Sequence, residues 1–309
     1  MKRILVTGGS GFIGSHIVEL CQGKYEIRVL DNFRTGRREN LNGLSCELIE
    51  GDVSDRAAVA AAVEGVDYIF HLAALVSVPE SMEKIVECNR INAEGTIILL
   101  EEAAKAKAKK LILSTSAANY GDNPVSPKVE TMTPEPKSPY SITKLDGEYY
   151  CNMFTQTGRL QTACLRYFNV FGPRQNPKSA YAAAVPIFIT KALANEDITI
   201  FGDGEQTRDF IFVKDIAAAN LYMAEHAEYT GVYNVAYGGK MSINTLAQMI
   251  VEILGSSSKI VHLPERPGDV KHSTACVDKL MSTGFKPSWD FRRGLEVTVR
   301  SYVEAMKQG

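Results

Sequence analysis

The sequence predicts an α/β protein built on a doubly wound parallel sheet. Short runs of β-branched and apolar residues alternate with helical stretches, which is the pattern of β-α-β units. The first run, "RILVTG", is largely apolar, as expected of a strand that is buried on both faces of a parallel sheet. A glycine-rich turn follows this run directly and opens into a helical stretch.

The strand-like runs recur at regular intervals in the first part of the chain. They cover residues 3–8, 26–31, 46–52, 67–73 and 110–116. Helical patterns are expected between them, at about 13–21, 54–65 and 92–108. The stretch around Tyr140 predicts another helix, and a strand is expected after it at 161–172.

The pattern loosens after residue 172. Residues 173–210 are rich in glycine, proline and charged residues and are expected to form mainly loops. Residues 210–227 predict a return to the sheet with a helix attached, and a strand at 231–239 and a helix at 242–254 follow. We therefore expect two domains. The larger comprises 1–172 plus 211–236, and the smaller, discontinuous domain comprises 173–210 plus 237–309.

Composition narrows the class of protein. With 45% hydrophobic and 23% charged residues among 309, the chain is typical of a soluble globular protein. The net charge of −2 indicates neither a nucleic-acid partner nor an anionic membrane surface. No apolar run approaches the ~18 residues of a membrane-spanning helix. The six cysteines form no C-x-x-C pair, so we expect no structural disulfide, no metal site and a reducing cytoplasm as the location.

The glycine-rich turn carries the first functional signal. Gly8, Gly11 and Gly14 are spaced as G-x-x-G-x-x-G between a predicted strand and a predicted helix. Residues without Cβ let the backbone turn tightly and let a pyrophosphate approach, while the free N–H groups of the helix point at the anion. A tight turn without a ligand is the alternative. The strand–turn–helix context favours the dinucleotide-binding fingerprint of a Rossmann-type sheet.

Acidic residues at the next two strand ends refine the choice of dinucleotide. Asp31 ends the second predicted strand, where a carboxylate accepts hydrogen bonds from both ribose hydroxyls and repels a 2′-phosphate. This favours NAD over NADP. Arg34, Arg37 and Arg38 follow closely and keep NADP open, because arginines bind phosphates. Asp52, after the third strand, is placed either to bind the adenine amine or to begin a helix.

Three further residues form a candidate catalytic group. In "SPYSITKLDGEYY", Tyr140 and Lys144 lie four residues apart, and therefore one turn along the same helix face. Ser116 ends the strand before that helix, at the edge of the sheet where ligands bind in open α/β folds. The Tyr-x-x-x-Lys spacing alone also fits a solvated surface pair, and a serine at a strand end also fits a cap. The ordered combination with the glycine motif and Asp31 favours a catalytic site.

At this point a resemblance to a known family is clear. The motifs "TGGSGFIGSH", "FHLAA", "STSAANYG", "YSITK", "LRYFNVFGPRQ", "FGDGEQTRDFIFVKD" and "RPGDV" occur in that order and span essentially the whole chain. The chain resembles the extended short-chain dehydrogenases/reductases, in their nucleotide-sugar epimerase branch. Within that branch it is similar to UDP-glucose and UDP-N-acetylglucosamine 4-epimerases.

The resemblance implies a reaction and a cofactor. A 4-epimerase of this family oxidises C4 of a UDP-hexose transiently with NAD, lets the ketone turn over, and reduces it on the other face. It implies that Tyr140 is the base, that Lys144 and the nicotinamide lower the pKa of its phenol from about 10, and that Ser116 orients the 4-oxygen. The cofactor-binding residues that it implies are Gly8, Gly11, Phe12, Ile13, Gly14, Asp31, Asn32, Asp52, Val53, Leu72, Ala73, Ala74, Tyr140, Lys144 and Tyr167.

The resemblance also implies a substrate side in the second domain. Arg208 and Arg266 match diphosphate-binding arginines, and Asp269 matches an acid that holds the nucleoside ribose. The other implied substrate contacts are Ser116, Asn169, Ala184, Val185 and Ser273. Ser273 matches a position where a small side chain leaves room for a 2-acetamido group, so UDP-GlcNAc and UDP-GalNAc are expected beside UDP-Glc and UDP-Gal.

Alternatives stay open within and beyond this branch. The related dehydratases carry an Asp-Glu pair where this chain has Ala117 and Ala118, which argues against dehydration. A UDP-glucuronate 4-epimerase or another NAD-dependent sugar modifier shares the same three residues. A non-catalytic NAD(H)-binding regulator is a third interpretation. The family also implies a homodimer that pairs through two helices, one of them the Tyr140 helix.

Overall fold

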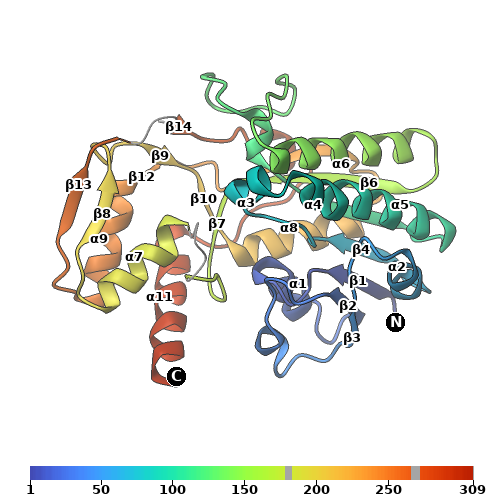
Figure 1. The fold of residues 1–309 in the computed structure, drawn as a ribbon, viewed down its shortest axis with the longest axis horizontal. Coiled ribbons are helices and arrows are strands. Elements are labelled where there is room, and N and C mark those ends of the chain that lie inside the picture. Colours follow the sequence, from blue (N-terminus) through green and yellow to red (C-terminus); the bar gives the residue numbers. More distant parts are fainter. Residues whose placement is uncertain (178–182, 266–271, 309) are drawn as a thin grey trace.

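The computed structural model describes residues 1–177, 183–265 and 272–308. Figure 1 shows a larger lobe built around one sheet and a smaller lobe, with short strands between them. The strands of the main sheet are β1 (Arg3–Thr7), β2 (Glu26–Asp31), β3 (Glu47–Glu50), β4 (Tyr68–His71), β5 (Lys110–Ser116), β6 (Gln161–Tyr167) and β11 (Gly231–Val235). The helices of the larger lobe are α1 (Phe12–Leu20), α2 (Arg56–Val63), α3 (Val78–Glu83), α4 (Ile85–Asn89), α5 (Gly95–Lys105), α6 (Pro139–Gln156), α8 (Val213–Glu225) and α10 (Asp278–Met281).

The main sheet is parallel throughout, with the strand order β11-β6-β5-β4-β1-β2-β3. The chain runs outward in one direction from β1 to β3 and in the other from β4 to β11. The order therefore reverses between β1 and β4, and ligands of open α/β sheets bind outside the carboxyl ends of the strands at such a point. The predicted doubly wound, Rossmann-type fold is confirmed.

Both faces of this sheet are covered by helices. Successive residues of a strand point to opposite faces. Ile4 and Val6 of β1 accordingly lie in the core beneath α1 and α8, whereas Leu5 lies in the core beneath α2 and α5. All three side chains are fully buried, which explains why the sequence of β1 is apolar rather than alternating.

The smaller lobe has its own hydrophobic core. Its helices are α7 (Ala184–Leu193), α9 (Ile243–Leu254) and α11 (Phe291–Gln308). Its strands form a parallel pair, β8 (Ile198–Phe201) with β13 (Ile260–Leu263), and a three-stranded sheet, β12 (Met241–Ser242), β9 (Thr207–Arg208) and β14 (His272–Ser273). The Ser242 side chain caps α9 by accepting from Thr245 N, and Gly255 ends that helix in the left-handed conformation.

Several predictions about the second half of the chain were wrong in detail. The strand expected at 161–172 is two strands, because β7 (Asn169–Phe171) leaves the main sheet after Phe168. β10 (Phe210–Phe212) does not return to the main sheet but pairs with β7 between the lobes. Residues 237–309 were assigned wholly to the second domain, yet Leu280 and Phe285 pack in the core of the main sheet.

Other elements were not expected from the sequence. Helix α7 lies within the stretch that we interpreted as mainly loop, and α3, α4 and α11 were not anticipated. A π-helical turn, Arg90–Glu94, joins α4 to α5. It overlaps the start of the continuous helix that was expected at 92–108. Such turns are often found at functional sites, and Ile91 of this turn lines the cavity described below.

Within the described residues, no helix combines the length and the apolar character that a bilayer crossing needs. Over the same residues, no three His, Cys, Asp or Glu side chains come together as a metal site.

Candidate active site

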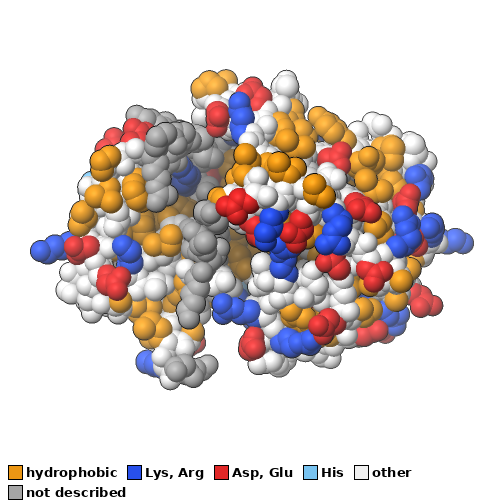
Figure 2. All heavy atoms as spheres, in the orientation of Figure 1, with side chains coloured by type: hydrophobic (Ala, Val, Ile, Leu, Met, Phe, Trp, Pro, Cys, Tyr) orange, Lys and Arg blue, Asp and Glu red, His pale blue; other side chains and the backbone are white. Residues whose placement is uncertain are grey.

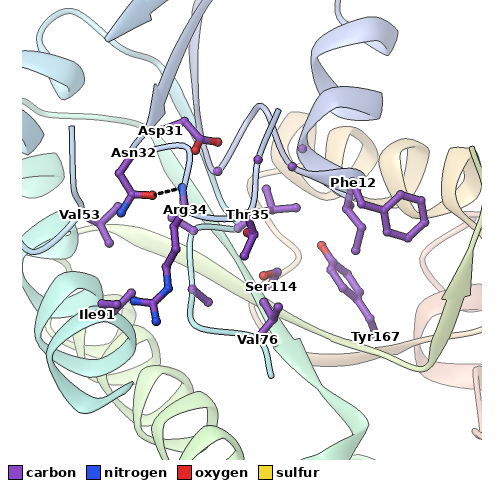
Figure 3. Close-up of a pocket in the computed structure, with 18 of the residues that line it drawn as sticks. Phe12, Asp31, Asn32, Arg34, Thr35, Val53, Val76, Ile91, Ser114 and Tyr167 are labelled. Atoms are coloured by element: carbon purple, nitrogen blue, oxygen red, sulfur yellow. Dashed lines mark hydrogen bonds between the residues drawn. The ribbon is translucent and has the colours of Figure 1, made fainter. Parts of the chain in front are cut away.

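A cavity of about 440 Å³ opens at the carboxyl ends of β1, β2, β4, β5 and β6 (Figure 3). It lies where the strand order reverses. All the residues predicted to bind the cofactor line it, with the single exception of Asp52. One end is formed by Asp31 and Asn32, and the other by Ser116, Tyr140 and Lys144. The structure thus brings the two groups of predicted residues to the ends of one cavity.

The glycine turn is sterically locked. A Cβ on Gly14 would lie 2.2 Å from the Gly8 carbonyl oxygen, and a Cβ on Gly8 would lie 2.8 Å from Ala73 N. Gly8 also has a φ of +69°, which side chains rarely adopt. The first N–H groups of α1 have no partner within the helix, so this close approach presents them to the cavity as an anion site. The turn therefore fits the pyrophosphate of a dinucleotide.

Asp31 is fixed in place by backbone donors. Its carboxylate accepts from Ser10 N at 3.0 Å and from Phe33 N at 2.8 Å, and the side chain is buried at the cavity wall. Each carboxylate oxygen has further acceptor capacity. A Cβ on Gly36 would lie 3.0 Å from this carboxylate, so the loop also needs a glycine there. This arrangement fits a ribose whose two hydroxyls donate to Asp31.

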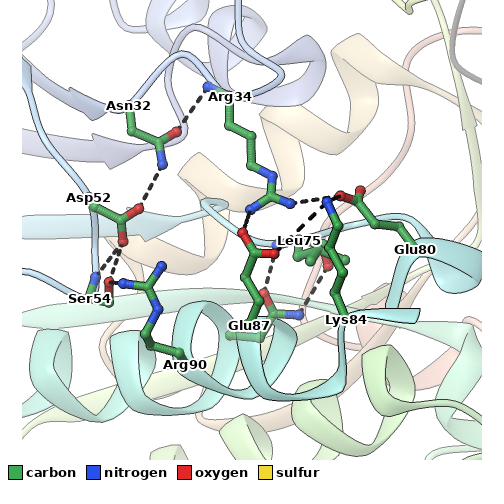
Figure 4. A network of polar contacts seen from close by, with 10 residues as sticks. Asn32, Arg34, Asp52, Ser54, Leu75, Glu80, Lys84, Glu87 and Arg90 are labelled. Carbon is green, nitrogen blue, oxygen red and sulfur yellow. Dashed lines mark hydrogen bonds and ion pairs between the residues drawn. The ribbon is translucent and has the colours of Figure 1, made fainter. Parts of the chain in front are cut away.

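Asp52 acts through a neighbour rather than on the cavity itself. Its carboxylate accepts from Asn32 Nδ2 at 2.8 Å and from both Ser54 N and Ser54 Oγ (Figure 4). Burial by itself would raise the pKa of Asp52, but these hydrogen bonds and the nearby Arg90 outweigh it and hold the pKa below its ordinary value. Asp52 therefore stays ionised and orients Asn32, which does line the cavity. Helix α2 is capped instead by Asp55.

Two of the arginines that kept NADP open are paired with carboxylates. Arg34 forms ion pairs with Glu80 at 2.7 Å and with Glu87 at 2.5 Å. Arg38 pairs with Glu50 and lies over the Phe33 ring. A 2′-phosphate would therefore compete with existing partners for both guanidinium groups and would face Asp31. The geometry agrees with NAD.

The candidate catalytic residues come from two elements. Helix α6 begins in a capping box, in which Ser138 Oγ accepts from Ser141 N and Ser141 Oγ accepts from Ser138 N. Tyr140 stands in its first turn, and Tyr140 N donates to Ser81 Oγ at 3.2 Å. Lys144, one turn later, is buried and donates to Ser114 O at 2.9 Å.

Burial sets the pKa values of this group. It raises the pKa of the Tyr140 hydroxyl, and a hydrogen bond with Ser116 opposes that shift only in part. It lowers the pKa of the Lys144 ammonium to about 8. Lys144 Nζ lies 6.0 Å from the centre of the Tyr140 ring. That Lys144 and the nicotinamide together lower the pKa of the phenol stays a prediction.

Ser116 has two roles in the structure. As the residue before a short 3₁₀ turn, Ala117–Tyr120, its Oγ accepts from Ala118 N at 3.1 Å. The cap that we considered as an alternative is therefore present. Because Oγ accepts in the cap, the hydroxyl proton of Ser116 can be donated to a second partner. The hydrogen bond with Tyr140 shows that this hydroxyl faces the catalytic end of the cavity.

A buried ion pair supports the strand end that carries Ser116. Arg166 makes a two-pronged contact with the carboxylate of Glu148, with distances of 2.9 and 2.7 Å, and both side chains are 3% exposed. Glu148 also accepts from Thr115 Oγ1 and Asn119 Nδ2. The carboxylate lies one turn beyond Lys144 on α6, and its charge raises the pKa of that ammonium against the effect of burial.

A second cavity of about 760 Å³ lies in the smaller lobe. Asn169, Ala184, Val185 and Arg208, all predicted to contact substrate, line it. Val170 lines both this cavity and the first one, so the two are neighbours. In Figure 2 the hollow between the lobes marks this region.

Three other predicted substrate residues do not line the described part of these cavities. Arg266 and Asp269 lie outside the described residues. Ser273 stands in β14, where it pairs in register with Arg208, and it is not among the described residues that line either cavity.

Many cavity residues were not found by sequence reasoning. In the first cavity these include Thr35, Gly36, Val76 and Ile91. In the second, apolar side chains come from five separate elements: Phe188, Ile200, Phe210, Ile243 and Leu263. Apart from Phe210, none belongs to a quoted motif, so only the fold brings them together. For the 32–37 loop, the available signal was Gly36 together with the arginines that follow Asp31.

Residues 4–236 match the model of the NAD dependent epimerase/dehydratase family. The chain belongs to this family. Among solved structures, it is 43% identical to a UDP-N-acetylglucosamine 4-epimerase from Methanobrevibacter ruminantium M1 in complex with UDP-N-acetylmuramic acid, with a TM-score of 0.95 and 99% of each chain covered. It is 36% identical to the UDP-glucose 4-epimerase of Thermotoga maritima with UDP-glucose, with a TM-score of 0.93 and coverage of 98% of this chain and 99% of that one.

A relative with another name is of similar likeness. The chain is 33% identical, over 98% of its length and of the relative's, to a UDP-N-acetyl-alpha-D-glucosaminuronate decarboxylase of Bacillus cytotoxicus. The family and its solved epimerases show that the present protein is an NAD-dependent enzyme of the UDP-sugar 4-epimerase type.

Proposed function

We propose that the enzyme interconverts UDP-hexoses at C4, acting on UDP-Glc/UDP-Gal and also on UDP-GlcNAc/UDP-GalNAc. The observation that supports this most is the meeting of Ser116, Tyr140 and Lys144 at one end of the cofactor cavity, beside a second cavity that shares Val170. A sugar joined to UDP would reach from the second cavity to these three residues.

The chain's own residues supply proton transfer and orientation. A bound NAD would supply the chemistry of hydride removal from C4 and its return. Tyr140 accepts the 4-hydroxyl proton and gives it back, and Ser116 holds the 4-oxygen through the hydroxyl proton that its cap leaves over. Lys144 uses one of its three N–H donors to bind Ser114 O, so the other two are left for the nicotinamide ribose and the phenolate. Since burial raises the pKa of Tyr140, the positive charges beside it have to offset desolvation before it serves as a base.

The second cavity suits a nucleoside diphosphate. Its wall is mostly apolar, which fits a base, and Arg208 supplies a guanidinium for phosphate. Arg266 and Asp269 complete this proposal from the sequence alone. Ala117 and Ala118 form the turn after Ser116 and offer no acid to expel a 6-hydroxyl, so dehydration is disfavoured.

Acceptance of N-acetylated sugars rests on two observations. Ser273 is small and stands beside Arg208 in the sheet, and the resemblance implies that a small side chain at this position leaves room for a 2-acetamido group. The M. ruminantium neighbour is named for an N-acetylated substrate, whereas the T. maritima neighbour was solved with UDP-glucose. We therefore propose that one pocket accepts both kinds of hexose.

The test is incubation of the enzyme with each of the four UDP-hexoses, with products identified by NMR. Conversion of both pairs is expected, and Ser273→Tyr should suppress the acetylated pair selectively. Turnover of UDP-Glc with none of UDP-GlcNAc would contradict the dual specificity. Release of carbon dioxide from a UDP-uronic acid, with no hexose epimerised, would favour the decarboxylase relative instead.

Two alternatives are separated by related measurements. A UDP-glucuronate 4-epimerase would act on the uronic acid without losing carbon. A non-catalytic NAD(H)-binding regulator would form no product, and the absorbance of its bound NAD would not change when UDP-sugar is added. The arrangement of Ser116, Tyr140 and Lys144 supports a catalyst over a regulator.

We further propose a homodimer, a cytoplasmic location and the two-domain division given above, with 278–285 moved to the NAD-binding domain. The dimer proposal rests on an apolar surface patch on α3, α4 and α6 (Figure 2). The patch consists of Met82, Ile85, Val86, Ile142, Tyr149 and Met153, which are 40–83% exposed. Patches of this kind on soluble proteins mark contact surfaces.

A further inference from the structure

Arg34 crosses the adenosine end of the cofactor cavity. In Figure 3 its side chain leaves the loop beside Asn32 and runs toward Ile91 on the far wall. Its backbone N–H donates to Asn32 Oδ1 at 3.0 Å, and Asn32 is in turn held by Asp52 at 2.8 Å. The starting point of the side chain is therefore fixed.

The far end of Arg34 is held as firmly. Its two terminal nitrogens bind different carboxylates: Nη2 lies 2.7 Å from Glu80 of α3, and Nη1 lies 2.5 Å from Glu87 of α4 (Figure 4). Lys84 lies between these acids, 3.0 Å from Glu80 and 4.0 Å from Glu87. The two positive and two negative charges balance, so the cluster needs no outside partner.

Arg34 joins elements that come from different parts of the sheet. The 32–37 loop belongs to the β2 side of the cavity, whereas α3 and α4 follow β4. A dinucleotide that occupies the cavity would have its adenosine between them, because Asp31, Asn32, Val53 and Ile91 surround that end.

We propose that Arg34 is a retaining residue for NAD, and that its double ion pair with Glu80 and Glu87 forms a strap that has to open before NAD leaves. The side chains of the three residues are 26–35% exposed, so they are shielded in part from water but still reached by salt. A reaction that uses the same NAD in every turnover gains from slow release. The proposal concerns the cofactor alone and does not depend on which sugar is the substrate.

The experiment measures release of NAD in the absence of any sugar nucleotide. Enzyme loaded with NAD is mixed with an excess of the fluorescent analogue etheno-NAD, and the rate of exchange is followed. The strap is broken by Glu80→Gln with Glu87→Gln, and independently by Arg34→Met. The matched control is Glu50→Gln, which breaks the Arg38–Glu50 ion pair, since neither residue lines the described cavity. Thermal unfolding of the NAD-free variants checks that each is folded.

Release of NAD is expected to be about five- to tenfold faster in both strap variants and unchanged in the control. This size of effect is what the loss of two partly exposed ion pairs would give. Raising the salt from ~0.05 to ~0.5 M should accelerate release from the wild type but not from the double variant. ADP-ribose, which lacks the nicotinamide, should show the same acceleration. Less than about a threefold change in both strap variants, an equal effect in Glu50→Gln, or an equal salt response in wild type and double variant would each overturn the proposal.

Discussion

Tyr140 and Lys144 are placed where water has poor access, and this affects both titrations. Tyr140 has its pKa raised by burial, while Lys144 has its pKa lowered to about 8. The two shifts move the pKa values of the phenol and the ammonium apart, and each is caused mainly by desolvation. A site of this kind becomes active when additional positive charge favours the phenolate.

Replacing Tyr140 by phenylalanine is expected to reduce epimerisation by about 10²- to 10⁴-fold, because the group that moves the proton is lost. NAD content should stay near that of the wild type, since the other cavity residues are intact. Initial rates with UDP-Glc and UDP-GlcNAc, beside the absorbance of bound NAD, provide the measurement. Undiminished turnover would show that the proposed base is wrong.

The buried ammonium gives a prediction about pH. Lys144 has a pKa of about 8 in the folded chain, below the ordinary 10.5, so between these values the unfolded chain binds more protons and stability rises with pH. Lys144→Met removes this titration. The unfolding temperature of the NAD-free wild type, minus that of Lys144→Met, should therefore increase as the pH rises from about 8 to about 10.5. A difference that is constant over this range would contradict the shift.

At the scale of single elements, the value of an ion pair depends on where it lies. Glu148→Gln leaves Arg166 charged and without its partner in the core, and we expect it to lower the free energy of unfolding by about 3–5 kcal/mol. Glu26→Gln breaks the pair with Arg3, whose side chains are 36% and 51% exposed, and should cost less than about 1 kcal/mol. Denaturant titrations of both variants make the comparison. Equal losses would mean that the buried pair does not hold the strand end beneath Ser116.

The elements that the sequence predicted well are those with local signals. The strands at 26–31 and 110–116 and the helix at Tyr140 have strong patterns or caps, and their expected positions are confirmed. β7 and β10 were misassigned because their sequences continue or resemble strands of the main sheet. What separates them from it is packing of Phe171, Phe210 and Phe212 in the smaller lobe, which no local pattern encodes.

The same division holds for the candidate site. Gly8, Asp31 and Tyr140 could be predicted because chemistry requires their residue types at particular strand or helix ends. Ile91 could not, because its place in the cavity depends on a π-helical turn. Arg34 was noted beside the dinucleotide, but its ion pairs were not foreseen, because its partners are carboxylates about 50 residues away. Asp52 is a further case: the sequence predicts that it lies near the cofactor, but it does not show that Asp52 binds Asn32 instead of lining the cavity.

At the scale of the whole molecule, the exposed patch on α3, α4 and α6 leads to a prediction about assembly. Ile142, 54% exposed on α6, should tolerate glutamate in a monomer but not inside an apolar interface. We expect the wild type to be a dimer and Ile142→Glu a monomer by light scattering. Met306→Glu, at a comparably exposed site on α11 of the other lobe, is the control. A monomeric wild type would rule out the proposed dimer.

The passage of the chain between lobes has a consequence for any attempt to divide the protein. β11 pairs with β6 at one side of the main sheet, although more than 60 residues separate them and α7, β8 and β9 of the smaller lobe lie between. A fragment ending at residue 172 would lack both β11 and α8. It would expose β6 as an open edge with an uncovered apolar face, which invites aggregation. Gene truncation would thus yield insoluble material rather than an isolated nucleotide-binding module, and functional dissection has to rely on point substitutions.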